Sequence, residues 1–412
     1  MMSPDPDSVE QWLLRFVQPD APRGERARLA SVQLLVRLDD PQDRVRAVHV
    51  VGTAGKGTVA RLVAASLRAA GGSVGLHQSP HVHDIRERFM VADELPSWEE
   101  VVAAIEEIRP HADVLASTGE PPTFFALTTA IALVMARRAG TDWLVVEAGI
   151  GGRVDATNVF GRDDVVTAVT AIGLDHTDVL GPTVATIATE KTAVFAGRTT
   201  AVLGPQPSSE AVDVARATAA EHGVRLVEVA ATNDWRHDAE ATAAAVLAEL
   251  DPSAPDPVFG SQPGRYEQEN LSEIRPSRWI FDGAHNPMKL TALVGPLRSE
   301  PGPRLGIVSV GEGKDLGGCA TAIAPALDAV IVVPFGPSPG SFRPRSHPTS
   351  VMVDAFRAAG VADVIDATDA DAAVAIATAR SEMSTVAVTG SFLHLNDVRR
   401  ALRRREITVQ GT

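Results

Sequence analysis

A glycine-rich turn near residue 52 has the residue types that bind phosphate. Residues 47–58 read AVHVVGTAGKGT, an apolar run followed by a turn with three glycines, one lysine and one threonine. Glycines let successive backbone N–H groups point at anionic oxygens, while Lys56 supplies a mobile charge and Thr58 a hydroxyl for a phosphate or its magnesium ion. The apolar run 59–69 predicts a helix whose N-terminus faces the same anion. The sequence therefore predicts a nucleotide-phosphate site made by Gly52, Thr53, Gly55, Lys56, Gly57 and Thr58.

Lysine is scarce in this chain, and this scarcity gives Lys56 more weight. Lysine and arginine together number 38, and only four of them are lysines: Lys56, Lys191, Lys289 and Lys314. Where arginine serves as the general surface cation, a retained lysine is a candidate for a compact point charge or a modifiable amine. The glycine spacing differs from the usual P-loop pattern, so a tight strand-to-helix turn with an incidental lysine is the alternative. For Lys289 we infer no role.

Four further polar stretches follow apolar runs, at strand ends, where an α/β sheet binds ligands. They begin at Gln78, Glu147, Asp175 and Asp282. Ser79, Glu147 and His176 offer a hydroxyl, a carboxylate and an imidazole that, with phosphate oxygens, could complete the coordination of magnesium. A structural ion pair is the alternative for Glu147, and a core or capping histidine is the alternative for His176. Lys191 follows on the next predicted helix, whose apolar face would bring the amine toward the same crevice.

The elements that would position these residues alternate between helix and strand. Helical spacing predicts helices at 9–17, 26–38, 98–108, 123–138, 183–195, 208–222 and 238–250. Apolar runs predict strands at 73–78, 142–147, 165–171, 200–203 and 225–229, and then at 279–282, 305–310, 329–333, 363–366 and 385–389. This alternation predicts a P-loop-containing, doubly wound, mostly parallel α/β domain followed by a smaller Rossmann-like domain. We place the first domain at 1–263, a linker at 264–276 and the second domain at 277–412.

The composition limits the partners and the compartment. A net charge of -14 argues against general binding to nucleic acid or to an anionic membrane. The single cysteine, Cys319, cannot form an internal disulfide, which favours a reducing compartment. No apolar run reaches the length of a membrane span. We therefore expect a soluble, cytoplasmic protein, a monomer that acts on small molecules.

Taken together, the motifs resemble those of folylpolyglutamate synthase and dihydrofolate synthase, within the ATP-dependent Mur ligase superfamily. The turn is followed in order by SPH with a later ER pair, PTFF, EAGIGGRVDATN, DH, EK, PGRYE and DGAHNP. The order and the approximate spacing agree over nearly the whole chain. The runs EAGIGGRVDATN and DGAHNP are the most specific part of the resemblance.

The resemblance implies an amide ligase that uses ATP and two magnesium ions. It implies that ATP binds the glycine-rich turn, that Ser79, Glu147 and His176 hold magnesium, and that Lys191 is carboxylated to a carbamate supporting the second ion. A substrate carboxylate would attack the γ-phosphate to give an acyl phosphate, and the amine of L-glutamate would then displace phosphate. The catalytic and nucleotide-binding residues in the C-terminal part would be Arg265 at the phosphates, Asp282 at the ribose and His285 nearby.

The same resemblance assigns the acid substrate, dihydropteroate or a folate, to Gln78, Arg88, Thr123, Phe124, Phe125, Val154, Asp155 and Ala156. The chain departs from the family at three positions. It has Ala54 where the family usually has Asn, Gln78 where the family usually has Thr or Ser, and Ala126 where the family usually has Glu. The segment 229–238 is shorter than in the family and has no recognisable adenine-contacting asparagine. Two alternatives stay open: an amide ligase for a non-folate acid, and a nucleotide-binding regulator without turnover.

Overall fold

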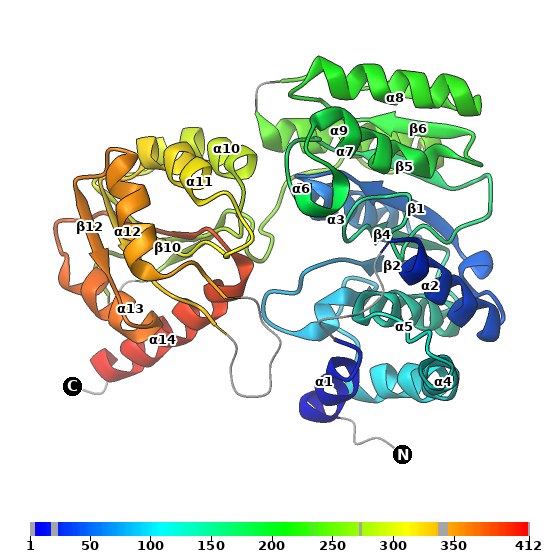
Figure 1. The fold of residues 1–412 in the computed structure, drawn as a ribbon, viewed down its shortest axis with the longest axis horizontal. Coiled ribbons are helices and arrows are strands. Elements are labelled where there is room, and N and C mark those ends of the chain that lie inside the picture. Colours follow the sequence, from blue (N-terminus) through cyan, green and yellow to red (C-terminus); the bar gives the residue numbers. More distant parts are fainter. Residues whose placement is uncertain (1–4, 18–23, 233, 272–273, 337–344, 411–412) are drawn as a thin grey trace. The chain divides into compact units, whose positions relative to one another are not determined.

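The chain forms two compact units, Met1–Phe259 and Gly260–Thr412. The computed structural model describes residues 5–17, 24–232, 234–271, 274–336 and 345–410. Figure 1 shows that each unit is an α/β structure built around one sheet.

The first unit contains a seven-stranded sheet in the order β3-β2-β4-β1-β5-β6-β7. Neighbouring strands run parallel, except that β2 and β3 are antiparallel. The central strands β1 and β4 are buried almost throughout, because helices cover both faces of the sheet. The strands are β1 (Arg46–Val51), β2 (Val74–His77), β3 (Phe89–Val91), β4 (Trp143–Glu147), β5 (Val166–Val169), β6 (Thr200–Leu203) and β7 (Arg225–Glu228).

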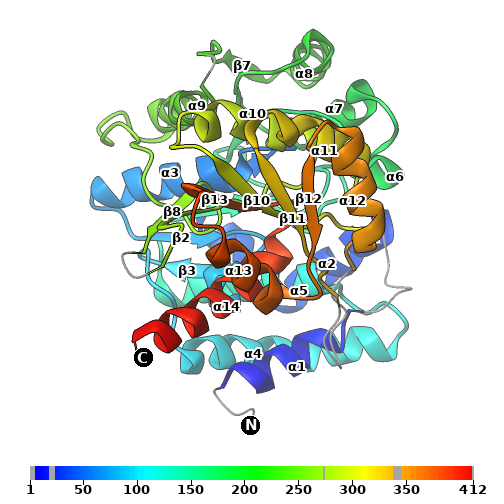
Figure 2. The same ribbon diagram turned by 90° about the vertical axis from the view of Figure 1, so that its left-hand side faces the viewer.

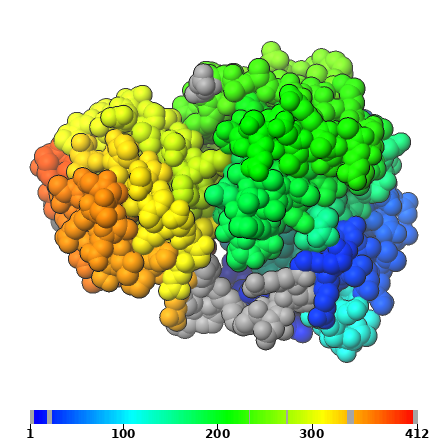
Figure 3. All heavy atoms as spheres, turned by 45° about the horizontal axis from the view of Figure 1, so that its top comes forward, coloured from blue at the N-terminus to red at the C-terminus, as the bar shows by residue number. Residues whose placement is uncertain are grey.

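The helices of the first unit are α1 (Pro6–Leu14), α2 (Glu25–Arg37), η1 (Pro41–Arg44), α3 (Lys56–Ala69), η2 (Ile85–Arg88), α4 (Trp98–Ser117), α5 (Phe124–Ala139), α6 (Thr177–Leu180), α7 (Val184–Thr192), η3 (Ala193–Phe195), α8 (Ser209–His222) and α9 (Trp235–Leu250). Successive β1 side chains enter opposite faces of the sheet. Val48 and Val50 join the core under α3 and α9. Ala47 packs with α1, α2, α4 and α5, and Val51 packs with α7 and α8. Figure 3 shows, in green, that the segments from β5 onward form much of one face of this unit.

The second unit contains a six-stranded sheet in the order β12-β11-β10-β13-β9-β8. Figure 2 shows its strands β12, β11, β10 and β13 next to one another. All pairs are parallel except β8 with β9. Its core includes Trp279 and Phe281, which are fully buried. The elements are β8 (Glu267–Asn270), β9 (Arg278–Phe281), α10 (Pro287–Arg298), β10 (Arg304–Val308), α11 (Leu316–Ile323), η4 (Ala324–Ala326), β11 (Ala329–Val332), α12 (Thr349–Ala358), β12 (Asp363–Asp366), α13 (Ala370–Ala379), β13 (Thr385–Thr389) and α14 (Phe392–Gln410).

The predicted α/β fold with two mostly parallel sheets is confirmed. Two antiparallel edge strands, β3 and β8, were not predicted, and β8 lies inside the segment 264–276 that we assigned to a linker. The compact units divide between Phe259 and Gly260, and the precise domain boundary stays a prediction. Among the described residues, no helix is both long and apolar enough to cross a membrane.

Candidate active site

The glycine-rich turn joins β1 to α3 and is held against the loop that follows β5. Gly52 has φ 148°, and a Cβ there would lie 2.0 Å from the Thr170 hydroxyl oxygen, so only glycine fits. The two N–H groups after Gly52 both donate to the carbonyl oxygen of Ala171, at 2.9 and 3.1 Å. Gly55 has φ 85° and is the N-cap of α3, and no described side chain caps this helix. The first amides of α3 are therefore available to an anion.

Two of the four lysines converge on this turn. The ammonium of Lys191, in the last turn of α7, donates to the carbonyl oxygen of Gly52 over 2.8 Å. The ammonium of Lys56 donates to the same oxygen over 3.2 Å. Lys191 is only 4% exposed, whereas Lys56 is half-buried. Two cations on one carbonyl at the start of a helix form a site that favours an anion.

The end of β4 places a carboxylate beside the loop that follows β2. Glu147 is buried, and its Oε2 accepts the backbone N–H of Ser79 over 3.0 Å. The Ser79–Pro80 peptide bond is cis. A buried carboxylate beside a serine offers oxygen ligands of the kind that magnesium prefers. These two predicted metal ligands are therefore in contact.

His176 lies in the loop between β5 and α7. It is the N-cap of α6 and has φ 50°, and its Nε2 lies 3.9 Å from the buried Asp175 carboxylate. The same loop contacts the glycine-rich turn, because the hydroxyl of Thr53 donates to the carbonyl oxygen of Gly173 over 3.0 Å. The described residues contain no group of three or more His, Cys, Asp and Glu arranged to hold a metal. A metal here would take most of its ligands from hydroxyl groups, substrate or water.

The glycine loop after β4 packs closely on the helix that carries Lys191. A Cβ on Gly152 would lie 2.6 Å from the carbonyl oxygen of Glu190, so the loop can approach α7 only with glycine there. Arg153 strengthens the contact, since its N–H donates to that carbonyl oxygen and its guanidinium pairs with the Glu190 carboxylate over 2.9 Å. The loop that continues through Val154 is thus fixed to the end of α7.

Asp155 is a buried carboxylate within this loop. Its Oδ2 accepts the N–H of Ile150 over 2.7 Å, and its Oδ1 accepts both the N–H and the hydroxyl of Thr157. Burial raises the pKa of the Asp155 carboxyl, although these hydrogen bonds and the charge of Lys56 oppose the shift. The neighbouring Ala156 is 9% exposed.

Arg88 is buried beside the β2 loop. Its Nε donates to Nδ1 of His81 over 2.9 Å, and its guanidinium lies 5.4 Å from the centre of the Phe124 ring. Burial lowers the pKa of Arg88 to about 10, and the charge of Glu147 is the largest effect opposing this shift. The neighbouring Gln78 is also buried, and its amide nitrogen donates to the carbonyl oxygen of Glu87 over 2.9 Å.

The start of α5 contributes an aromatic pair. Thr123 caps this helix, because its hydroxyl accepts the N–H of Ala126 over 3.1 Å. Phe125 packs edge-on to the glycine loop, where a Cβ on Gly149 would lie 2.6 Å from its ring. The N-cap of α5, the Phe124–Phe125 pair and the glycine loop after β4 therefore lie together in the first unit.

In the second unit, Asp282 organises the segment that contains Arg265. One carboxylate oxygen accepts the N–H of Tyr266 over 2.7 Å and the other accepts the N–H of Ala284 over 2.8 Å. Tyr266 has φ 51°, an uncommon conformation for an aromatic residue. Burial raises the pKa of Asp282 to about 6, although its two backbone hydrogen bonds lower it. Arg265 donates to the carbonyl oxygen of Pro263 over 3.3 Å.

His285 follows two residues after Gly283. Its Nδ1 lies 2.7 Å from the carbonyl oxygen of Gly283, which can only accept, so Nδ1 carries a proton. Its Nε2 lies 3.0 Å from the ammonium of Lys289, to which we had assigned no role. Arg265, Asp282 and His285 thus all lie in the second unit, and their predicted contacts with a nucleotide bound to the first unit stay predictions.

Several residues that hold this site in place were not predicted from the sequence. Glu87 accepts the N–H groups of Val82 and His83 over 2.8 Å each, and so fixes the loop before Arg88. His49 and Thr157 form a buried hydrogen bond behind Asp155. His49 had a visible signal, because it is a lone polar residue inside an apolar run. Glu87 had only its place in the ER pair.

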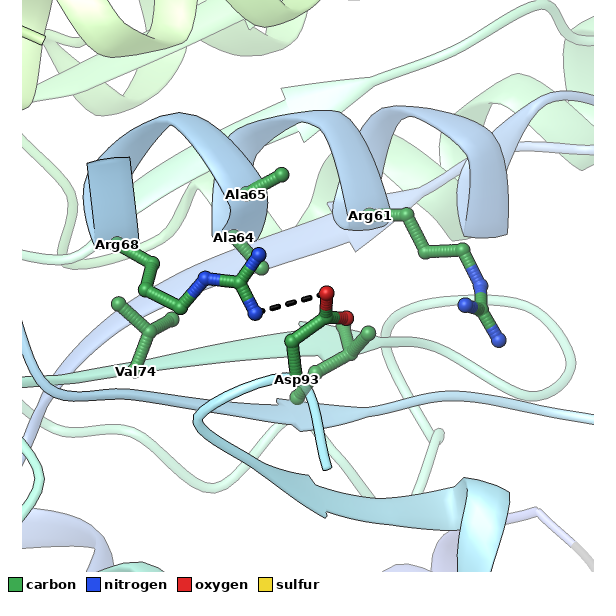
Figure 4. A pocket seen from close by; sticks show the side chains of 7 residues that line it. Arg61, Ala64, Ala65, Arg68, Val74 and Asp93 are labelled. Atoms are coloured by element: carbon green, nitrogen blue, oxygen red, sulfur yellow. Dashed lines mark ion pairs between the residues drawn. The ribbon is translucent and has the colours of Figure 1, made fainter. Parts of the chain in front are cut away.

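A shallow pocket lies along the later turns of α3, and it is separate from the glycine-rich turn. Figure 4 shows Arg68 reaching across it to Asp93, with which it forms an ion pair of 2.7 Å. The two charges are therefore paired with each other, and we assign this pocket no part in the site. Its lining residues are Arg61, Ala64, Ala65, Arg68, Val74, Leu76 and Asp93.

Comparison with known proteins identifies the family. Residues 264–392 match the family described as Mur ligase, glutamate ligase domain. The dihydrofolate synthase/folylpolyglutamate synthase of Escherichia coli is 33% identical over 68% of this chain and 70% of its own. The chain belongs to the folylpolyglutamate synthase and dihydrofolate synthase family. A second relative in this family, the probable bifunctional folylpolyglutamate synthase/dihydropteroate synthase of Halobacterium salinarum, is 32% identical over 93% of this chain. The chain spans about half (52%) of the length of that relative.

Solved structures of the family agree with this fold over nearly the full chain. Escherichia coli FolC in complex with DHPP and ADP superimposes with a TM-score of 0.81 at 26% identity, covering 97% of this chain and 98% of that one. The Yersinia pestis bifunctional enzyme complexed with AMPPNP and a Mn ion gives a TM-score of 0.80 at 26% identity, covering 96% and 98%. The family fold is thus shared by both units.

Proposed function

We propose that this protein is an ATP-dependent ligase that joins L-glutamate to a pterin acid or folate through an acyl phosphate. The observation that carries the proposal is the convergence of Lys56 and Lys191 on the carbonyl oxygen of Gly52, at the uncapped start of α3. The uncapped helix N-terminus and the Lys56 ammonium are suited to the polyphosphate of ATP, and the buried Lys191 amine lies beside them. The relatives bound to ADP and to AMPPNP support the choice of nucleotide.

In the proposed reaction the carboxylate of the acid attacks the γ-phosphorus of ATP, and ADP leaves. The amine of glutamate then attacks the acyl carbon, loses a proton and expels phosphate, which leaves an amide. Lys56 would neutralise charge on the transferred phosphoryl group, and the amides at the start of α3 would hold the adjacent oxygens. Arg265 would contribute a second cation at the phosphates. Asp282 would bind the ribose of ATP, and His285 would lie nearby.

The proposed magnesium ligands lie at or after the ends of the strands β2, β4 and β5. Ser79, Glu147 and His176 would hold magnesium, which supplies charge neutralisation to the phosphates. The buried Glu147 carboxylate supports this, because it lies beside Ser79 and offers the oxygen ligands that magnesium prefers. We propose further that Lys191 carries a carbamate that supports a second ion, since a buried amine against the turn is the group that could react with carbon dioxide.

The acid would bind among the β2 loop, the start of α5 and the glycine loop. Arg88 is buried beside Phe124, and Asp155 is fixed in the neighbouring loop, which gives one cation and one anion for recognition. The Escherichia coli structure with DHPP supports a pterin acid. We also propose a cytoplasmic monomer without nucleic-acid or membrane partners, and the net charge of -14 supports the absence of polyanion binding.

The test is turnover by the purified protein with ATP, magnesium, L-glutamate and either dihydropteroate or tetrahydrofolate. We expect phosphate release that depends on both the pterin acid and glutamate, and a product heavier by one glutamate in mass spectrometry. Phosphate release with a different carboxylic acid alone would favour the non-folate ligase. Tight ATP binding without phosphate release from any acid would favour the regulator and contradict the proposal.

A further inference from the structure

A buried chain of hydrogen bonds joins the central strand to the glycine loop. His49, in the middle of β1, is completely buried, and its Nε2 lies 2.8 Å from the hydroxyl oxygen of Thr157. That hydroxyl in turn lies 2.6 Å from Oδ1 of Asp155. Thr157 is also completely buried, and Asp155 is 4% exposed. The chain His49–Thr157–Asp155 therefore links the sheet to a carboxylate that we place at the acid substrate.

The neighbouring groups determine which atom donates the proton in each of the two hydrogen bonds, His49–Thr157 and Thr157–Asp155. A threonine hydroxyl has one proton, so it can donate to His49 or to Asp155 but not to both. Asp155 accepts two backbone N–H groups as well, which favours the charged carboxylate as an acceptor of the hydroxyl proton. His49 must then be the donor, from Nε2.

The surroundings of His49 favour the same arrangement. Burial and, as the smaller effect, the charge of Arg198 lower the pKa of His49 to about 3, so the ring is neutral at physiological pH. With the proton on Nε2, Nδ1 has only a lone pair. No described group is hydrogen-bonded to Nδ1, which is buried. A proton on Nδ1 would be an unpaired buried donor near the Arg198 cation, which is the costlier state.

We propose that His49 is a positioning residue: as the Nε2–H tautomer it fixes the hydroxyl proton of Thr157 on Asp155 and so holds that carboxylate in one orientation toward the acid substrate. The inference rests on the proposed function for the role of Asp155, but the tautomer and the hydrogen-bond direction do not depend on any substrate. Two charged side chains act on these hydrogen-bonded residues. The charge of Lys56 lowers the pKa of Asp155, and the charge of Arg198 lowers the pKa of His49.

The first experiment removes the hydroxyl and keeps the shape. In Thr157→Val we expect the KM for the pterin acid to rise by about tenfold to a hundredfold, the range for a hydrogen bond to a charged group, with the KM for ATP nearly unchanged. The acid limb of the pH profile of kcat/KM should move to higher pH, because the carboxylate loses a donor that favours its charged form. Thr157→Ser keeps the hydroxyl and should restore both values.

A matched control lies directly beside His49. Thr167 on β5 is the register partner of His49, and its hydroxyl is buried with no hydrogen-bond partner among the described residues. Thr167→Val therefore removes a buried hydroxyl from the same layer but none of the hydrogen bonds between His49, Thr157 and Asp155. It should leave the KM for the pterin acid and the pH profile unchanged. Equal effects from Thr157→Val and Thr167→Val would overturn the positioning role.

A second pair of variants tests His49 itself. In His49→Gln the amide nitrogen can take the place of Nε2 and donate to Thr157, so we expect most of the affinity for the acid to be kept. In His49→Leu no donor remains, and the KM for the acid should rise as in Thr157→Val. A glutamine variant as impaired as the leucine variant, with both folded by circular dichroism, contradicts a donor role.

Nuclear magnetic resonance of the wild-type protein tests the tautomer without any substrate. We expect His49 to show a protonated Nε2 and a bare Nδ1 throughout pH 5–8, and a protonated Nδ1 would overturn the inference. The titration midpoint of the Asp155 carboxyl should be higher in Thr157→Val than in the wild type, and equal midpoints would also overturn it. A wild-type protein that uses no pterin acid would contradict the proposed function. The His49 tautomer and the Asp155 titration midpoint would still show whether the hydrogen bonds have the proposed direction.

Discussion

The ammonium of Lys191 lies 2.8 Å from the carbonyl oxygen of Gly52, a residue 139 positions earlier in the chain. The contact brings the end of α7 to the start of the glycine-rich turn. The glycine loop after β4 packs on the same end of α7, where a Cβ on Gly152 would lie 2.8 Å from the carbonyl oxygen of Lys191. The amine is thus held beside the turn to which we assign the phosphates of ATP.

Lys191→Arg should reduce the turnover rate at least about a hundredfold, the order found when a preorganised electrostatic group is lost. Arginine keeps the charge but cannot form a carbamate. Lys191→Ala should be partly rescued by short carboxylates such as formate, which could occupy the vacated space. Phosphate release is the measurement, with Lys314→Arg as the matched control. Near wild-type activity of Lys191→Arg would remove both the carbamate and the second metal from the proposal.

Lys56→Ala should abolish ATP turnover and leave the thermal unfolding midpoint nearly unchanged, because the half-buried side chain donates one hydrogen bond to a backbone carbonyl of the turn. Phosphate release and a thermal melt measure the two effects. Arg68→Ala on the same helix is the control, since it removes a cation whose partner is Asp93 and should keep activity. Wild-type phosphate release by the Lys56 variant would rule out this turn as the ATP site.

Arg265→Ala should lower kcat more than the affinity for ATP. The segment around Arg265 is fixed within the second unit, because Asp282 holds the N–H of Tyr266 and Glu267 accepts the N–H of Gly264 over 2.8 Å. The variant therefore removes a guanidinium without releasing the backbone, and its effect should appear only in the transition state. Calorimetric ATP binding beside steady-state kinetics separates the two quantities. Weakened ATP binding at an unchanged kcat is the contrary outcome.

Asp282 should make the protein less stable as the pH rises from 4 to 6. Its pKa is about 6 in the folded protein and 3.8 ordinarily, so the folded state binds more protons in this window and loses stability as they leave. The difference corresponds to about 3 kcal/mol of unfolding free energy. Urea unfolding from pH 4 to 7 would measure it, and Asp282→Asn should show a flatter curve. Parallel curves for the two proteins would contradict the assignment.

Gly152→Ala should destabilise the protein by about 1–3 kcal/mol, because the new Cβ would lie 2.6 Å from a backbone carbonyl that cannot rotate away. Activity should fall with it, since the loop and the end of α7 separate. Gly161→Ala is the control in the same connection, because a Cβ there meets nothing within 4 Å. Chemical unfolding compares the two variants, and equal stabilities would show that the loop can move aside.

The sequence predicted the buried parallel strands well, because a strand covered on both faces is a continuous apolar run. It did not predict β8, whose residues EQEN are all polar and pair only along one edge of the second sheet. It also ended a helix at Ile108, whereas α4 continues to Ser117 through Pro110, which removes only one hydrogen bond of the helix. Local composition does not show such edge pairing or packing.

The types of the candidate site residues were predictable from their motifs, but their contacts were not. The approach of Lys191 to Gly52 depends on how α7 packs beside β5, and the chain from His49 to Asp155 crosses from a strand to a distant loop. Both contacts join residues more than 100 positions apart. Such contacts are set by tertiary packing rather than by spacing along the chain.

The burial of Lys191 and the partial burial of Lys56, Lys289 and Lys314 mean that no lysine of this protein is fully exposed. The outer surface therefore carries its positive charge as guanidinium groups. Amine-directed reagents such as succinimidyl esters will find few targets besides the chain's α-amino group. Carbon-13 reductive methylation should yield a spectrum of only a few resonances, one of them from the half-buried Lys56 amine beside Gly52, so that ligand binding could be followed without assigning the whole protein.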